Sequence, residues 1–354
     1  MRIALTRREA LDVPDGINTF LFSLADALLE LGHEVTVVSS ARANLAKLHD
    51  FYSLARWPDI VPLGNHQSVD YRHSLRAWLA NGRTVLRAVD PDLIVINGAV
   101  PIRFGARTCI VSHDAERRLG AWPVLRTAYK RYCYAKADIV VATCEEVRVA
   151  LAAELRMSPR EIRVIPTCVN LASYRSKPFD QREDAILHMG TVDYKNPLSS
   201  IKAFAAMARV SGKLYVTGKP TPEMHELLRG FPAPIREGIE LLGYVPAARL
   251  FELLGSVKIV SVPSSYAAPV ASPTVIEALA SGTPVVTSPS ISREVVTDGV
   301  NGFVRDPADV NAMASAYETL LHDAAAWRRI ADLAAASAHT FSARRVAERY
   351  LDLV

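Results

Sequence analysis

The residues most suited to chemistry form a short segment in the second half of the chain. Ser272 is a preferred helix N-cap residue and Pro273 suits the first helical position, so a helix is predicted to begin there. The backbone amides of Thr274 and Val275 would lack partners inside that helix, and the helix dipole favours an anion beside them. We expect a diphosphate at this point, with Glu277 one turn further on accepting hydrogen bonds from ribose hydroxyls. The alternative is a well-capped helix in which Glu277 caps its own amides.

A histidine is the second candidate. His113 follows the apolar run Cys109–Val111, which predicts a buried strand. Parallel α/β sheets bind ligands at the carboxyl ends of their strands. His113 is therefore expected to donate a hydrogen bond to a substrate hydroxyl or to orient a second substrate, and a structural histidine bonded to its neighbours is the alternative. Asp114 either positions His113 or caps the next helix.

Strands and helices that would position these residues alternate along the first half of the chain. In the stretch Asn18–Leu31 the apolar side chains recur on one helical face, Gly32 stops the helix, and Glu34–Val38 starts the next strand. This alternation indicates a parallel sheet with helices on both faces. The predicted strands of this half are Arg2–Leu5, Glu34–Val38, Leu93–Ile96, Cys109–Val111 and Ile139–Ala142.

The same alternation begins again after about residue 180. The predicted strands are Ala185–Met189, Lys213–Thr217, Glu240–Leu242, Ile259–Val262 and Pro284–Thr287, and the predicted helices include Leu198–Val210, Ala247–Leu254 and Thr274–Ser281. The polar, proline-containing stretch Pro166–Glu183 is interpreted as the connection between two domains. We expect doubly wound domains at 1–170 and 171–336 with a cleft between them, and a last helix at 337–354 that packs back toward the first domain.

Composition and charge are those of an ordinary globular protein. The chain has 354 residues, is 50% hydrophobic and has a net charge of +4, which is too small to indicate a nucleic-acid partner. Its four cysteines have no CxxC spacing, which argues against a zinc site or a redox pair. A cytoplasmic location is expected, because the first residues lack a signal-peptide core and no apolar run is long enough to cross a membrane. Asp90 and Asp92 form a DxD pattern, but they precede a strand, so turn and capping roles are expected and no metal site.

Several segments resemble glycosyltransferase family 4, whose members share the GT-B fold. Ala271–Val286 resembles the family's C-terminal donor motif. The other matching segments, in chain order, are His33–Val38 (the family's GHEV strand), Arg163–Asn170 (its VIPNGVD connection), Met189–Lys195 (its GRL…K turn), Gly243–Pro246 and Asp298–Phe303. The resemblance covers nearly the whole chain, and it implies two Rossmann-like domains, the first for the acceptor and the second for a nucleotide-sugar donor.

The resemblance also assigns roles to residues. It implies that Gly16, after the first strand, approaches the donor phosphates, where a backbone without a Cβ fits beside a bulky anion; a plain turn glycine is the alternative. It implies that Lys195 contacts the diphosphate and offsets charge on the leaving group, unless it is a solvated surface lysine. His113 lies where the family has a histidine near the transferred sugar. Glu294 either faces the donor or has a local structural role.

One departure from the family pattern concerns a carboxylate. The family has two glutamates eight residues apart, and counting back eight residues from Glu277 reaches Pro269. The first glutamate normally lies near the donor sugar, so its absence puts the identity of the sugar in doubt. The main chain of Ala271–Pro273 is the candidate substitute.

A second departure concerns a cation. Thr191 stands where the family has an arginine, so Lys195 alone remains of a cationic pair. Arg293 and Lys219 are the candidate substitutes. Thr191 itself is placed among the predicted donor-binding residues.

The activity implied is that of a retaining, metal-independent hexosyltransferase. No carboxylate stands out as a covalent nucleophile, so front-face substitution is expected, in which the acceptor hydroxyl attacks on the side from which the diphosphate leaves. The co-substrate would be a UDP- or GDP-sugar without a further cofactor, and the acceptor a glycan, a lipid-linked sugar or a small metabolite. The alternatives are a degenerate sugar-nucleotide-binding protein and a sugar-nucleotide epimerase. A dehydrogenase is disfavoured because no GxGxxG follows the first strand.

No residue names the acceptor, but two segments of the first domain are candidates for contacting it. The segment 49–76 is predicted to be a long acceptor-shaping loop with Phe51, Trp57, His66 and His73. The region Arg117–Lys136 is basic and aromatic. A helix of that kind can lie on an anionic membrane, here its inner face, or can be a solvated helix with its aromatic side chains in the core. Its cationic and aromatic residues are Arg117, Arg118, Trp122, Arg126, Tyr129, Lys130, Arg131, Tyr132, Tyr134 and Lys136.

Overall fold

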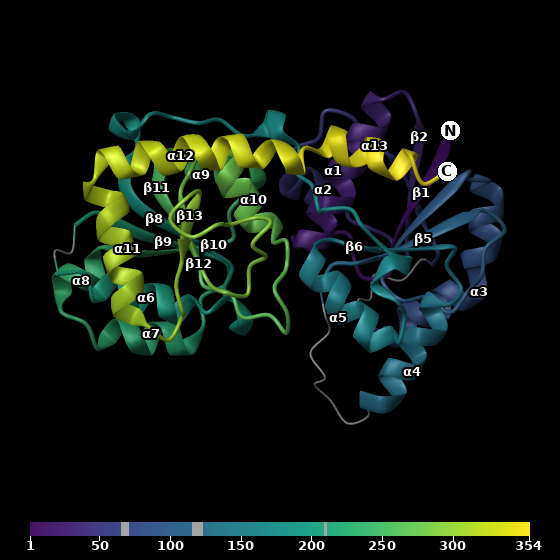
Figure 1. Ribbon diagram of the computed structural model, residues 1–354, viewed down its shortest axis with the longest axis horizontal. Coiled ribbons are helices and arrows are strands. Elements are labelled where there is room, and N and C mark those ends of the chain that lie inside the picture. Colours follow the sequence, from purple (N-terminus) through teal and green to yellow (C-terminus); the bar gives the residue numbers. More distant parts are fainter. Residues whose placement is uncertain (65–70, 115–122, 209–210) are drawn as a thin grey trace. The chain divides into compact units, whose positions relative to one another are not determined.

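The structure, a computed structural model, describes residues 1–64, 71–114, 123–208 and 211–354. The chain divides into two compact units: residues 1–170 with 341–354 form the first, and residues 171–340 form the second. Each unit contains one parallel β sheet with helices on both faces (Figure 1). This is the doubly wound α/β arrangement predicted from the alternating pattern.

The sheet of the first unit has its strand order reversal between β1 and β4. Across the sheet the strands are β3 (Asp59–Pro62), β2 (Glu34–Ser39), β1 (Arg2–Arg7), β4 (Leu93–Asn97), β5 (Arg107–Ser112), β6 (Ile139–Ala142) and β7 (Ile162–Val164). The helices of this unit are α1 (Gly16–Glu30), α2 (Leu45–Phe51), α3 (Tyr71–Val89), α4 (Pro123–Tyr134), α5 (Glu145–Leu155) and α13 (Ala343–Leu351). Ligands of such sheets bind at the carboxyl ends of the strands beside the reversal.

The last helix of the chain belongs to the core of the first unit. Helix α13 packs against α1, and the ring of Tyr350 lies 6.1 Å from the ring of Phe20. Val346 and Tyr350 are fully buried. The segment before α13 is tied to the unit by a backbone bridge between Val169 and Ser342. The C-terminal residues therefore complete a hydrophobic core that begins near the N-terminus.

The second unit repeats the plan, with its reversal between β8 and β11. Across its sheet the strands are β10 (Ile239–Gly243), β9 (Lys213–Thr217), β8 (Glu183–Met189), β11 (Val257–Val262), β12 (Val285–Thr287) and β13 (Gly302–Val304). The helices are α6 (Pro197–Ala205), α7 (Pro222–Arg229), α8 (Ala233–Glu237), α9 (Ala247–Ser256), α10 (Pro273–Ala280), α11 (Val310–His322) and α12 (Ala324–Ala338), and a one-turn 3₁₀ helix, η4, spans Asp193–Lys195.

The predicted elements are present, with three differences. The helix predicted at Leu198–Val210 ends at Ala205. The strands β3, β7 and β13 were not predicted. The predicted loop at 49–76 is wrong, because it contains the end of α2, all of β3 and the start of α3. Trp57 from this segment packs on His49 and Phe22, with ring centroids 4.0 and 5.8 Å away, so it is a partly buried side chain that packs against the core. His66 lies outside the described residues, as does the side chain of His73.

Candidate functional site

The N-terminus of α10 follows the loop after β11. Helix α10 begins at Pro273 with Ser272 as its N-cap, as predicted, although the Ser272 hydroxyl makes no capping bond. The amide of Val275 donates to the carbonyl of Ser272 at 3.1 Å. The prediction of a free amide at Val275 is therefore wrong, because the first turn is tightened into an i to i−3 bond. The amide of Thr274 has no acceptor among the described residues.

Glu277 lies one turn into α10 and is 8% exposed. Its Oε1 atom accepts a hydrogen bond of 3.1 Å from the hydroxyl of Tyr174. Within the described part of the chain its carboxylate caps no helix amide, so that alternative is wrong. Burial raises the pKa of Glu277 to about 7, while the bond from Tyr174 and the charge of Lys195 act in the opposite direction. This carboxyl group is thus poised to change its charge near neutral pH.

Lys195 brings a cation to the same helix terminus. It is the last residue of η4, and its Nζ atom donates to the Thr274 hydroxyl at 3.1 Å, so it is not a solvated surface lysine. Burial lowers the pKa of Lys195 to about 8, and the charge of Glu277 opposes that shift. An ammonium group, a helix N-terminus and a carboxylate therefore lie together within the second unit. The first two suit an anion, and the third suits hydroxyl groups.

The turn that carries Lys195 is held by a chain of buried hydrogen bonds. Gly190 adopts a φ of +90°, which favours glycine, and its carbonyl lies 2.9 Å from Nε2 of His188. The Nδ1 atom of His188 lies 2.8 Å from Ser200, which is 2.7 Å from Ser261, which is 2.6 Å from the hydroxyl of Tyr317. Burial lowers the pKa of His188 to about 4, so the ring is neutral and Nε2 donates to Gly190. No local sequence pattern marks this series of hydrogen bonds, since its members lie on four different elements.

Thr191 joins the loops after β8 and β9. Its hydroxyl donates to the carbonyl of Lys219 at 2.6 Å. A Cβ at Gly218 would lie 2.9 Å from the same hydroxyl, so the two loops approach as closely as a glycine allows. Thr191 therefore fixes the backbone of Lys219 beside the turn that carries Lys195. Arg293 is exposed.

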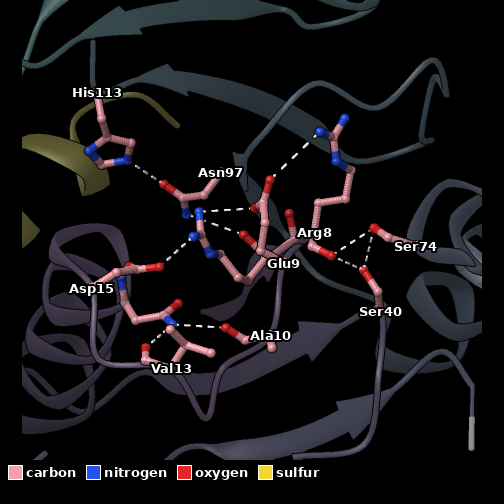
Figure 2. Close-up of polar contacts among 12 residues, drawn as sticks. Arg8, Glu9, Ala10, Val13, Asp15, Ser40, Ser74, Asn97 and His113 are labelled. Carbon is pink, nitrogen blue, oxygen red and sulfur yellow. Dashed lines mark hydrogen bonds and ion pairs between the residues drawn. The ribbon is translucent and has the colours of Figure 1, made fainter. Parts of the chain in front are cut away.

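His113 follows β5 in the first unit, as predicted. Its Nε2 atom lies 2.8 Å from Oδ1 of Asn97, the last residue of β4, and Figure 2 shows the ring directed at that amide. The ring also packs edge-on against Phe20, with centroids 4.9 Å apart. Burial, with a further contribution from the charge of Arg7, lowers the pKa of His113 to about 3, so the ring is neutral. Asp114, the partner considered from the sequence, is exposed, and Asn97, which was not predicted, contacts the ring.

Near His113, a buried arginine occupies the carboxyl end of β1. The side chain of Arg7 is 5% exposed and pairs with Asp15 at 2.8 Å and with Glu9 at 3.1 Å. Asp15 is the N-cap of α1 and accepts the amide of Asn18 at 2.7 Å. Gly16 is the first residue of this helix and is not in a left-handed conformation. The N-terminus of α1 therefore already holds a carboxylate from the protein, and phosphate binding at Gly16 stays a prediction.

The remaining candidates from the sequence have local partners. Asp90 pairs with the side chain of Arg2 at 2.7 Å, and Asp92 accepts the amide of Arg2 at 2.8 Å. In the basic segment, Lys130 is buried and pairs with Glu154 at 2.8 Å. Arg117, Arg118 and Trp122 of the same segment lie outside the described residues.

Two family models match the chain, one in each unit. Residues 14–173 match Glycosyltransferase Family 4, and residues 183–323 match Glycosyl transferases group 1. The chain belongs to glycosyltransferase family 4. No curated protein matches this glycosyltransferase in sequence.

Solved structures share the fold of this family 4 glycosyltransferase over its whole length. Sucrose-phosphate synthase from Thermosynechococcus elongatus is 17% identical with a TM-score of 0.76, covering 99% of this chain and 97% of its own. The Anabaena protein HepE in complex with UDP and glucose is 17% identical with a TM-score of 0.75, covering 99% and 98%. WaaG, a glycosyltransferase involved in lipopolysaccharide biosynthesis, is 15% identical with a TM-score of 0.74, covering 99% of both chains. The architecture is thus GT-B.

Among the described residues, the helices of this glycosyltransferase are too short or too polar to span a membrane.

Proposed function

We propose that this glycosyltransferase transfers a hexose from a UDP- or GDP-sugar to an acceptor hydroxyl with retention of configuration. The observation that carries the proposal is the position of the Lys195 ammonium, 3.1 Å from Thr274 at the N-terminus of α10. The adjacent Thr274 amide and the Glu277 carboxylate give the same place a donor for phosphate and an acceptor for ribose. The UDP in the similar Anabaena structure supports a uridine nucleotide as the first choice.

In the proposed reaction the bond from the sugar to the diphosphate breaks as negative charge gathers on the departing phosphate oxygen. Lys195 and the amide and hydroxyl of Thr274 stabilise that charge, and Glu277 holds the ribose. The acceptor hydroxyl attacks on the same face, and its proton passes to the departing phosphate oxygen. Ser272, Pro273 and Val275 shape the helix terminus, while Gly16 and Thr191 are assigned to the donor through the family pattern. His113 is assigned to a hydroxyl of the transferred sugar or the acceptor.

Ligand binding and donor hydrolysis test the proposal directly. Calorimetry with UDP, GDP, ADP and dTDP should show that one diphosphate binds best. That diphosphate should also raise the melting temperature most, because a ligand that binds only the folded state stabilises it. With UDP-glucose or GDP-mannose and water as the acceptor, proton NMR should show the released sugar first as the anomer that the donor carries. Release of the opposite anomer first would contradict retention. A chelator should leave the rate unchanged if no metal takes part.

A binding protein without transferase activity is the second candidate, since Pro269 stands where the family has a glutamate. The experiment that separates the two functions measures slow hydrolysis of the sugar nucleotide by the protein. Tight nucleotide binding with no release of sugar over many hours would favour the binding protein.

A cytoplasmic location with peripheral contact at the inner membrane face remains part of the proposal. The exposed side chains of Leu125 and Tyr132 on α4 favour such a contact, whereas Lys130 is engaged with Glu154 and is not available for it. Flotation of the protein with vesicles containing anionic lipid should decide, with neutral vesicles as the control.

A further inference from the structure

Tyr174 is a buried tyrosine whose hydroxyl contacts Glu277 of the candidate donor site. It follows the 3₁₀ turn Leu171–Ser173, where the chain enters the second unit. The residue is 7% exposed, and its ring packs edge-on against Phe251 of α9 with centroids 5.0 Å apart. Its hydroxyl donates to Oε1 of Glu277 at 3.1 Å. The ring is thus fixed by packing, and the hydroxyl is aimed at one carboxylate oxygen.

The bond divides the two oxygens of Glu277 between protein and ligand. Oε1 is occupied by Tyr174, and Oε2 receives no hydrogen bond within the described parts of the chain. The nearby ammonium of Lys195 is directed to Thr274. A carboxylate with one oxygen already bonded has its plane fixed, and the other oxygen then faces a ligand in a single orientation.

We propose that Tyr174 is a positioning residue that orients Glu277 so that Oε2 accepts the vicinal hydroxyls of the donor ribose. This rests on the proposed function and deepens it. Tyr174 contacts no substrate in this proposal and acts through Glu277 alone. Its effect is therefore confined to ligands that have the ribose hydroxyls.

The test uses the full chain with Tyr174→Phe, which keeps the ring and removes the hydroxyl. Tyr215→Phe is the matched control, because the Tyr215 hydroxyl also bonds a glutamate, Glu183 at 2.5 Å, at the start of β8. Calorimetry measures UDP, 2′-deoxy-UDP and 3′-deoxy-UDP against each protein, with GDP and its deoxy forms in their place if GDP is the nucleotide that binds. Melting temperatures confirm that each variant is folded.

We expect Tyr174→Phe to weaken UDP binding by about five- to tenfold. This is the effect of losing one hydrogen bond to a charged group, together with the fixed orientation that the bond gives to the Glu277 carboxylate. The affinity for the deoxy nucleotides should fall little, so Tyr174→Phe should largely lose the preference that the wild type has for UDP over its deoxy forms. Tyr215→Phe should keep that preference. In the Glu277→Gln background the Tyr174→Phe change should add no further loss, because the two residues act as one unit.

Equal weakening of all three nucleotides by Tyr174→Phe would overturn the inference, since a merely structural role has that effect. Unchanged UDP affinity would overturn it as well. The proposed function fails in a different way, namely if the wild type binds none of the nucleotides. A wild type that binds UDP, depends on Glu277 and ignores Tyr174 keeps the function and removes the inference.

Discussion

The Nε2 atom of His113 lies 2.8 Å from the Oδ1 atom of Asn97, so one amide determines which nitrogen of the imidazole carries the proton. Asn97 uses its Nδ2 atom to donate to the carbonyl of Thr6, which leaves Oδ1 as an acceptor. The proton of His113 therefore resides on Nε2, and Nδ1 is free of it. A substrate hydroxyl that meets Nδ1 would donate its hydrogen bond, the reverse of the role expected from the sequence.

Removing this amide should impair turnover more than nucleotide binding. We expect Asn97→Ala to lower kcat/KM by about 10- to 100-fold, the usual size of an orienting contact, while UDP affinity changes less than twofold. Steady-state kinetics and calorimetry measure the two quantities. An equal loss in both would show that Asn97 supports the fold in general.

The neutrality of His113 can be observed without any substrate. Because burial lowers its pKa to about 3, its ring carbon signals in NMR should not move between pH 5 and pH 8. Asn97→Asp places a carboxylate beside the ring, which favours the protonated form and raises the pKa. A titration should then enter the accessible range. A wild-type histidine that already titrates near pH 6 would contradict the expectation.

Nucleotide affinity should be greatest in a narrow window of pH. The competent form has Glu277 ionised and Lys195 protonated. Since the pKa of Glu277 is about 7, affinity falls as the pH drops below 7; since that of Lys195 is about 8, affinity falls as the pH rises above 8. Calorimetry with UDP from pH 5.5 to 9.5 measures both limbs. Glu277→Gln is the control for titration of the UDP phosphate, because it should remove the part of the acid limb that belongs to the protein.

Loss of the Lys195 ammonium should affect the chemical step most. Lys195→Met keeps much of the stem, and we expect kcat to fall by about 10²- to 10³-fold, as for removal of a group that stabilises a leaving oxyanion. Thr274→Val should cost only several-fold, because the backbone amide remains. Single-turnover kinetics would separate these effects from product release. Similar losses in the two variants would argue against Lys195 as the principal cation.

Tyr350 gives a pair of stability predictions in opposite directions. It is fully buried, so Tyr350→Ala should destabilise the first unit by about 3–5 kcal/mol, in line with other large aromatic truncations. Its hydroxyl is buried without a hydrogen-bond partner in the described chain, so Tyr350→Phe should be neutral or stabilise by about 1 kcal/mol. Urea unfolding monitored by circular dichroism measures both. A Phe variant that is clearly less stable would mean that the hydroxyl has an unseen partner.

The longer elements were predictable because their apolar runs are buried and their ends have local signals. Gly32, with φ of +83°, ends α1 where the sequence placed the stop, and Gly282, with φ of +59°, follows α10. The strand Gly302–Val304 was missed because three residues, one buried and two of intermediate burial, are too few to show a periodicity. Its place is determined by pairing with β12, which is a long-range effect.

The site was predictable where one segment carries the signal. Ser272, Pro273 and Glu277 belong to one helix, and the sequence shows where that helix begins. The bond that ties the Val275 amide was missed, since a propensity for helix does not separate a tight first turn from a regular one. Asn97 and Tyr174 were missed because their partners lie 16 and 103 residues away.

The return of α13 to the first unit has a consequence for protein synthesis. The ribosome completes the second unit before it has made the residues that close the core of the first. Until then the nascent chain exposes the apolar face of α1, including Phe20, which α13 later covers. Folding of the first unit during translation is therefore incomplete until α13 has been synthesised, and a nascent chain that stops before residue 343 would leave part of this core exposed.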